Sequence, residues 1–144
     1  MKKCVLLMAM MLVAFCANAF DFDGIDLNSN YTNVAQEISK RGYIYDSSRD
    51  CLKGNCQGKE IYLSLDYTNV SKSGKVGKLT VEIPTDNPEV SFNEAVNIFN
   101  VVYHQIPNNG SFDYAVSNDG TKLVVSKNST SIVLTYITPF YKQK

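Results

Sequence analysis

The sequence predicts an α+β fold made of two helix-plus-three-strand repeats, which give one antiparallel sheet with both helices on one face. Apolar residues recur at helical spacing in two stretches, residues 29–41 and 91–107. Each stretch is followed by runs of alternating apolar and polar residues, and the turns between these runs are short, as in antiparallel meanders. We therefore predict a six-stranded sheet and an internal duplication, with pseudo-repeats at about 28–85 and 90–138.

The chain begins with a pattern typical of a secretory signal peptide, which we assign to residues 1–19. Two lysines directly after the first residue form the charged start, residues 5–16 form the apolar core, and Ala17-Asn18-Ala19 matches a cleavage site. This pattern predicts that a single domain, residues 20–144, is exported to the periplasm or secreted.

A second interpretation of the leader makes Cys16 a lipid-anchored first residue. Residues 13–16 match a bacterial lipobox at their first two positions, whereas Phe15 replaces the small residue expected before the cysteine. The apolar run is shorter than the roughly 20 residues that cross a bilayer, so no transmembrane span is predicted. The net charge of zero and the absence of a basic run give no reason to expect a nucleic-acid partner.

The first half of the exported domain has the pattern of a short helix followed by strands. Gly42 is the expected end of the helix, and strands are predicted at residues 43–46, 60–67 and 76–83. The residues predicted to face the core are Tyr31, Val34, Ala35 and Ile38 of the helix, and Ile61, Leu63, Leu65, Leu79, Val81 and Ile83 of the strands.

Residues 50–58 are predicted to form a polar loop that holds Cys51 and Cys56. An isolated pair of cysteines in an exported chain usually forms a disulfide, so we predict a Cys51–Cys56 bond with a structural role. Redox pairs have the spacing C-x-x-C, and a zinc site needs about four ligands, so neither alternative fits this pair.

The second helix is the strongest pattern in the sequence. Ser91 and Glu94 form a capping box at its start, and Pro107 ends it. His104 is placed on the solvent face of this helix, opposite the apolar stripe. Three strands are predicted after it, at residues 111–117, 121–127 and 131–138. The apolar stripe consists of Phe92, Ala95, Val96, Phe99, Val102, Tyr103 and Ile106.

No set of residues with a recognisable catalytic or metal-binding spacing is found, so neither an enzyme nor a cofactor or metal is predicted. His104 is the only histidine and has no H-E-x-x-H partner. The acidic cluster Asp21, Asp23 and Asp26 lacks the spacing and the distal glutamate of a calcium loop, and is interpreted as solvated. A small periplasmic hydrolase remains an alternative, because two carboxylates can be brought together by the fold.

Tyrosine is the most suggestive residue type, with nine tyrosines and no tryptophan. If Ile44 points into the core, Tyr43 and Tyr45 point to the open face of the sheet, and Tyr62 can join them from the next strand. Tyrosine is favoured at interfaces because it buries area while it keeps a polar tip. These three residues form a candidate partner-binding surface, or they simply cover the open face of the sheet.

The order of elements resembles the β-lactamase-inhibitor-protein-like group, which includes small outer-membrane assembly lipoproteins. The stretch Phe22-Asp23-Gly24-Ile25-Asp26-Leu27, followed by a short helix and Arg41-Gly42-Tyr43, also resembles small exported Bacteroidetes proteins of no assigned function. The resemblance implies a fold and a compartment, and it implies no catalytic residue.

We therefore expect an exported, non-enzymatic binding or assembly module of the bacterial envelope. Its expected partner is another envelope or extracellular protein or a peptide. The alternatives are the small hydrolase and a structural lipoprotein associated with the outer membrane.

Overall fold

A computed structural model describes residues 21–22, 25–27, 29–56, 58–67, 74–106, 112–115 and 120–141 of the chain. The predicted signal peptide, residues 1–19, lies outside the described residues, as do Cys16 and Asp23. In the described part of the chain, no helix is long and apolar enough to cross a membrane.

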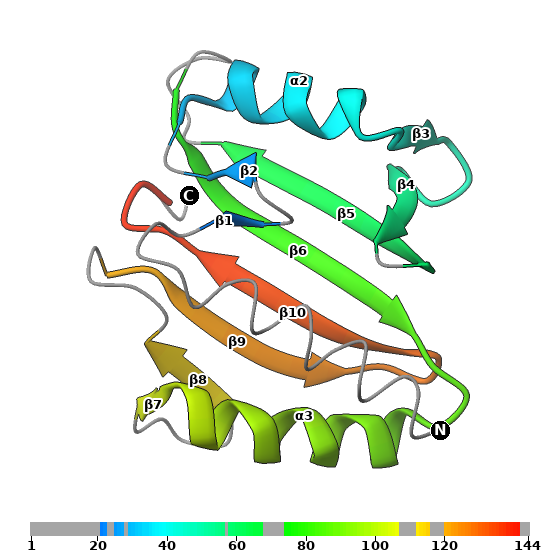
Figure 1. Cartoon of the computed structure of the whole chain (residues 1–144), viewed down its shortest axis with the longest axis vertical. Helices are drawn as coiled ribbons and strands as arrows, with labels where there is room; N and C mark the ends of the chain where they lie inside the picture. The colour runs from blue at the N-terminus through cyan, green and yellow to red at the C-terminus, as the bar shows by residue number, and fades with distance from the viewer. Residues whose placement is uncertain are drawn as a thin grey trace.

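Across these residues, two helices accompany an eight-stranded antiparallel sheet and a separate two-stranded sheet (Figure 1). The small sheet pairs β1 (Asp21–Phe22) with β2 (Ile25–Asp26). The large sheet has the strand order β3-β4-β5-β6-β10-β9-β8-β7. Its elements, with the helices, are α2 (Tyr31–Lys40), β3 (Ile44–Asp46), β4 (Cys51–Cys56), β5 (Lys59–Tyr67), β6 (Val76–Pro84), α3 (Pro88–Val102), β7 (His104–Ile106), β8 (Phe112–Ala115), β9 (Lys122–Lys127) and β10 (Ser131–Ile137).

The α+β class and the antiparallel sheet are confirmed, and the predicted number of strands is corrected from six to eight. The additional strands are β4, where a loop was predicted, and β7, where the end of a helix was predicted. Each pairs with a neighbour in sequence, β4 with β5 and β7 with β8. Pairing with an adjacent strand satisfies backbone groups that a polar loop would leave to water, so segments without clear alternation still become strands.

The register of the strands defines the two faces of the large sheet. Residues directly opposite one another in an antiparallel pair share a face. One such row crosses five adjacent strands and points into the hydrophobic core; it consists of Leu52, Leu63, Val81, Leu134 and Val125. We call this side the covered face and the opposite side the open face.

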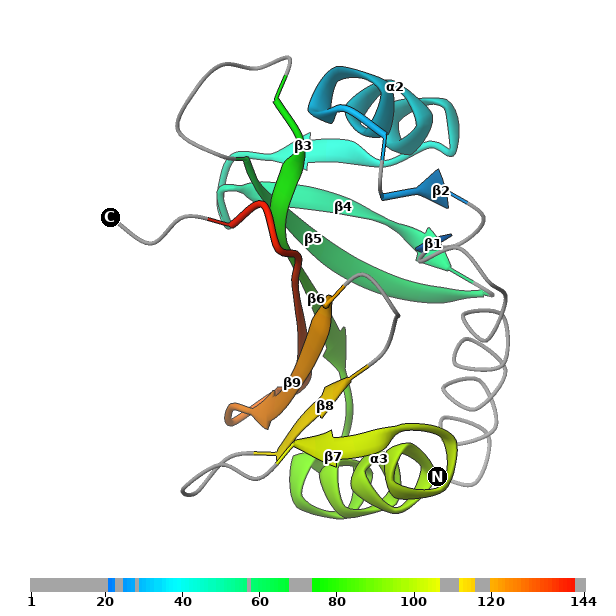
Figure 2. The same ribbon diagram turned by 90° about the vertical axis from the view of Figure 1, so that its left-hand side faces the viewer.

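Both helices pack on the covered face, near opposite ends of the sheet (Figures 1 and 2). In α3, the ring of Phe99 lies 5.5 Å from the ring of Tyr114, whose register partner Leu123 also points into the core. In α2, Val34 and Ile38 are buried in the same core cluster as Leu63. Ile25 of β2 is buried in this cluster as well.

The second helix begins and ends earlier than predicted. Its N-cap is Asn87, whose side chain accepts a hydrogen bond from the backbone N–H of Val90 at 3.3 Å, and a proline occupies the first turn. Ser91, the predicted cap, is buried and forms a hydroxyl–hydroxyl hydrogen bond of 2.6 Å with Thr85. The helix ends at Val102, so the prediction that His104 lies on the helix is wrong. His104 pairs with Ala115 as part of β7.

The predicted disulfide is also wrong: Cys51 and Cys56 are both thiols in this structure. They occupy the two ends of β4, and five residues of strand span about 16 Å, whereas a disulfide needs Cα atoms within about 7 Å. Because the two cysteines are five positions apart along the strand, and side chains alternate between the faces, their side chains also point to opposite faces. The strand geometry therefore prevents the bond that the spacing in sequence favours.

Candidate functional site

The segment from the end of α2 to β3 places the first two predicted binding residues. Gly42 has a φ of +88°, a conformation in which glycine is free of side-chain strain, and it turns the chain from α2 towards β3. Tyr43 follows directly and is 2% exposed, and its ring lies over Gly54 of β4. A side chain at position 54 would overlap the ring, so a glycine there makes room for Tyr43 in the core.

The predicted phase of β3 is therefore off by one residue. Because Tyr43 is buried, Ile44 turns to the open face, where it shares a row with Lys53 and Tyr62. Tyr45 pairs with Leu52 and lies on the covered side of the sheet. The structure thus separates the three tyrosines: Tyr43 is in the core, Tyr45 is on the covered side, and Tyr62 is on the open face as predicted.

A cavity of about 530 Å³ lies between α2 and the first strands of the sheet, beside Tyr45. We call it the α2 cavity. Its rim and walls combine aliphatic side chains, tyrosines and a few polar groups; they are Tyr31, Ala35, Ile38, Ser39, Tyr43, Tyr45, Asp50, Cys51, Leu52, Leu63, Ser64 and Leu65. Its size falls within the range of about 300–1,000 Å³ that is typical of ligand pockets.

Tyr45 is held at the rim of the α2 cavity by the turn between β3 and β4. Its hydroxyl donates a 2.6 Å hydrogen bond to Asp50 Oδ1, and this bond raises the pKa of Tyr45. Asp50 has a φ of 51°, in the left-handed region that non-glycine residues seldom adopt. At the start of the turn, Asp46 Oδ1 accepts hydrogen bonds from the backbone N–H and the hydroxyl of Ser48, which lower the pKa of Asp46.

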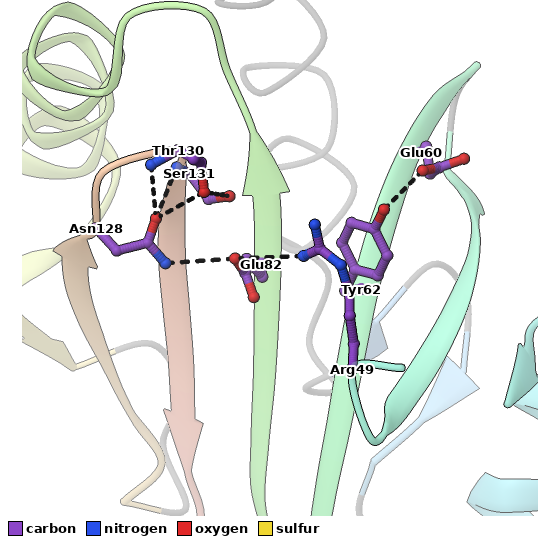
Figure 3. Close-up of polar contacts among 7 residues, drawn as sticks. All are labelled: Arg49, Glu60, Tyr62, Glu82, Asn128, Thr130 and Ser131. Atoms are coloured by element: carbon purple, nitrogen blue, oxygen red, sulfur yellow. Dashed lines mark hydrogen bonds and ion pairs between the residues drawn. The ribbon is translucent and has the colours of Figure 1, made fainter. Parts of the chain in front are cut away.

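The same turn sends Arg49 across the open face, onto the third predicted tyrosine (Figure 3). The Arg49 guanidinium lies 4.1 Å from the centre of the Tyr62 ring, and its Nη1 is 3.9 Å from Glu82 Oε1. The Tyr62 hydroxyl donates a 2.8 Å hydrogen bond to Glu60, which raises the pKa of Tyr62. Tyr62 is 8% exposed as a result, so it does not offer an open aromatic surface.

The polar network continues from Glu82 to the turn between β9 and β10 (Figure 3). Asn128 Nδ2 donates to Glu82 Oε1 at 3.3 Å. Asn128 Oδ1 accepts from the backbone N–H groups of Thr130 and Ser131, at 2.9 and 2.8 Å. These bonds fix the turn and orient the amide towards Glu82. The network therefore ties together turns from the two halves of the sheet.

A hollow of about 240 Å³ lies beside this network, lined by Arg49, Cys51, Tyr62, Ser64, Thr80 and Glu82. Burial raises the pKa of the Cys51 thiol, which keeps it protonated at neutral pH. A third hollow, of about 370 Å³, borders Ile44 of β3 and is lined by Arg41, Gly42, Ile44, Lys53, Gly54, Asn55 and Glu60. Among the described residues, one carboxylate lines each of these two hollows, and one lines the α2 cavity.

No group of three or more histidine, cysteine or acidic side chains that could hold a metal ion occurs among the residues described. In comparisons with known proteins, no family model, no curated protein and no solved structure matches this chain. The resemblances noted from the sequence therefore stay predictions.

Sequence analysis did not identify Asp50 or Arg49 as site residues. Asp50 is the first residue of the segment predicted to be a polar loop, Arg49 directly precedes that segment, and their partners Tyr45 and Tyr62 were predicted to share one surface. Gly54 is the signal that could have located the site, because a glycine inside a strand often marks the close approach of another group.

Proposed function

We propose that the exported domain is a non-enzymatic binding module that binds an extended peptide segment of a partner protein at the β3 edge of its sheet. The observation that carries this proposal is the exposure of Ile44 and Tyr45, at 67% and 62%, on the two faces of an edge strand. An edge strand presents backbone groups that can pair with another chain. Two large apolar side chains on such an edge make pairing favourable on both faces.

The surroundings of β3 support recognition of a peptide in extended form. In strand addition, main-chain hydrogen bonds supply affinity and pockets for alternate side chains supply specificity. Each face of β3 has a neighbouring hollow, the α2 cavity beside Tyr45 and the 370 Å³ hollow beside Ile44. Successive side chains of an added strand point to opposite faces, so they would lie by turns beside the α2 cavity and beside the 370 Å³ hollow.

We further propose that the sheet arose by duplication of one helix-plus-strands unit. The order of strands supports this: β3-β4-β5-β6 is followed by β10-β9-β8-β7, and each set of four comes after one helix. In such an arrangement the first strand of each unit lies at an outer edge of the sheet, where it can become a binding edge.

The test uses peptides selected from a random linear library on the wild-type protein. We expect Tyr45→Ala to weaken their binding by about 2 kcal/mol, roughly thirtyfold in Kd, as for an interface hot spot. Fluorescence anisotropy measures Kd, and circular dichroism verifies that each variant is folded. Val101→Ala is the matched control, because Val101 is a large apolar residue, 86% exposed, on α3. Unchanged binding by folded Tyr45→Ala, or weaker binding only in Val101→Ala, would contradict the proposal.

A further inference from the structure

We propose that the α2 cavity receives the long cationic side chain, lysine or arginine, of the extended peptide that pairs with β3. This inference rests on the proposed function and specifies which peptides the β3 edge selects. It follows from three properties of the site: the direction in which β3 sends its side chains, the apolar walls of the cavity, and the charge at its rim.

The direction comes from the pleat of the sheet. Side chains of a strand added beside β3 alternate between the two faces, as those of β3 do. Tyr45 lies on the covered side and borders the α2 cavity. Every second side chain of the added strand therefore lies on the side of the cavity, and the residues between them lie on the side of Ile44.

The walls of the α2 cavity suit the hydrocarbon stem of a long side chain. Ile38 of α2 forms one wall, and Leu52 and Leu65 of the sheet form the opposite one. Tyr31 and Tyr45 add aromatic surface, on which an alkyl stem or a guanidinium plane packs well. Lysine and arginine bury such stems along apolar surface while they keep their charged ends at a polar rim.

The charged group at the rim of the cavity determines whether a cationic or an anionic side chain binds there. Among the described residues that line the α2 cavity, Asp50 carries the only charged side chain. Its Oδ1 accepts the Tyr45 hydroxyl at 2.6 Å, and an ionised carboxylate has about four acceptor positions on its two oxygens. A cationic group can therefore bind Asp50 without displacing Tyr45. An acidic side chain would meet like charge in the same place.

A second copy of this chain is a less suitable occupant of the β3 edge. β3 contains three residues, about 10 Å of strand, so twofold pairing of β3 with β3 joins only a short segment from each chain. A stable dimer usually buries about 800 Å² on each partner, far more than such a segment covers. A peptide can instead place a side chain deep in the cavity beside the strand.

The experiment uses a labelled host peptide, acetyl-Thr-Val-Thr-Xaa-Thr-Val-Thr-amide, in which Xaa is lysine, arginine, norleucine or glutamate. NMR titration and fluorescence anisotropy measure Kd for the full-length wild-type protein and its variants. We expect the lysine and arginine peptides to bind roughly tenfold more tightly than the norleucine peptide, as for one hydrogen bond to a charged group. The glutamate peptide is expected to bind most weakly.

Asp50→Asn should remove the preference for lysine over norleucine while it preserves the turn, because asparagine readily adopts positive φ. The matched control is Asp86→Asn, at an exposed carboxylate before α3, and this variant should keep the preference.

Equal binding of the lysine and norleucine peptides, with both lost in Tyr45→Ala, would overturn this inference and leave the proposed function standing. Absence of binding by every host peptide at millimolar concentration would overturn both. A dimer that Tyr45→Ala dissociates would identify a second copy as the occupant.

Discussion

Replacement of Phe99 by alanine is expected to lower the free energy of unfolding by about 3–5 kcal/mol. Phe99 is fully buried in the last turn of α3, and its ring lies 5.8 Å from that of Tyr103 and 5.5 Å from that of Tyr114. Tyr114 is itself held to α3, since its hydroxyl donates a 2.9 Å hydrogen bond to the Asn100 side chain. The surrounding groups are therefore fixed, and they cannot close a cavity of this size by small movements.

Urea denaturation followed by circular dichroism measures this effect. Val101→Ala provides the control, because Val101 lies in the same helix and is 86% exposed. We expect the control to change stability by less than about 0.5 kcal/mol, as for a surface position. Equal losses in the two variants would contradict the helix phase described above, and with it the assignment of the covered face.

Replacement of Gly54 by valine is expected to destabilise the domain by about 3 kcal/mol, the upper part of the usual range for overpacking. A Cβ atom at position 54 would overlap the Tyr43 ring, and that ring is enclosed in the core. Asn55→Val is the matched control, because it adds the same side chain to the next, exposed position of β4. Equilibrium unfolding is expected to show little loss in the control.

A double variant attributes the effect of Gly54→Val to the overlap with Tyr43. Addition of Tyr43→Ala to Gly54→Val should cost less than Tyr43→Ala costs alone, because the smaller side chain removes the overlap. Strictly additive losses would show that valine at position 54 destabilises the strand for another reason. The burial of Tyr43, which sets the phase of β3, would then lose its physical explanation.

The parts of the fold that sequence analysis predicted correctly are those with strong periodicity. Leu79, Val81 and Ile83 alternate with polar residues, and all three are buried in β6. The helical stripe around Phe99 is confirmed in the same way. In these segments one face is apolar and the other polar, so the local pattern and the tertiary packing require the same structure.

The parts that were missed are those in which tertiary contacts override the local pattern. Tyr103 and Ile106 continue the predicted helical stripe, but α3 ends at Val102, Tyr103 adopts extended backbone angles, and the chain then pairs with β8. In β3, the local pattern left two phases open, and the space above Gly54 selects the one that buries Tyr43. Since a shift by one residue exchanges the faces of a strand, this single contact moves Tyr45 to the covered side.

The candidate site depends on the same long-range contacts. The turn after β3 places Asp50 against the Tyr45 hydroxyl on the covered side of the sheet, and it places Arg49 over the Tyr62 ring on the open face. Neither pair has a spacing that a sequence motif would reveal. The cavity itself requires α2 and β5 to be placed together, which only the complete sheet does.

The central claim, that β3 is the binding edge, is tested most directly by amide chemical-shift mapping of the protein with the lysine host peptide. We predict that the amides of Ile44, Tyr45 and Asp46 shift, and that those whose N–H points away from β4 become protected from hydrogen exchange, because a new strand pairs with them. The amide of Gln105, in β7 at the opposite edge of the sheet, should stay unchanged. Shifts confined to β7, or to the open face around Tyr62, with β3 unaffected, would contradict the claim.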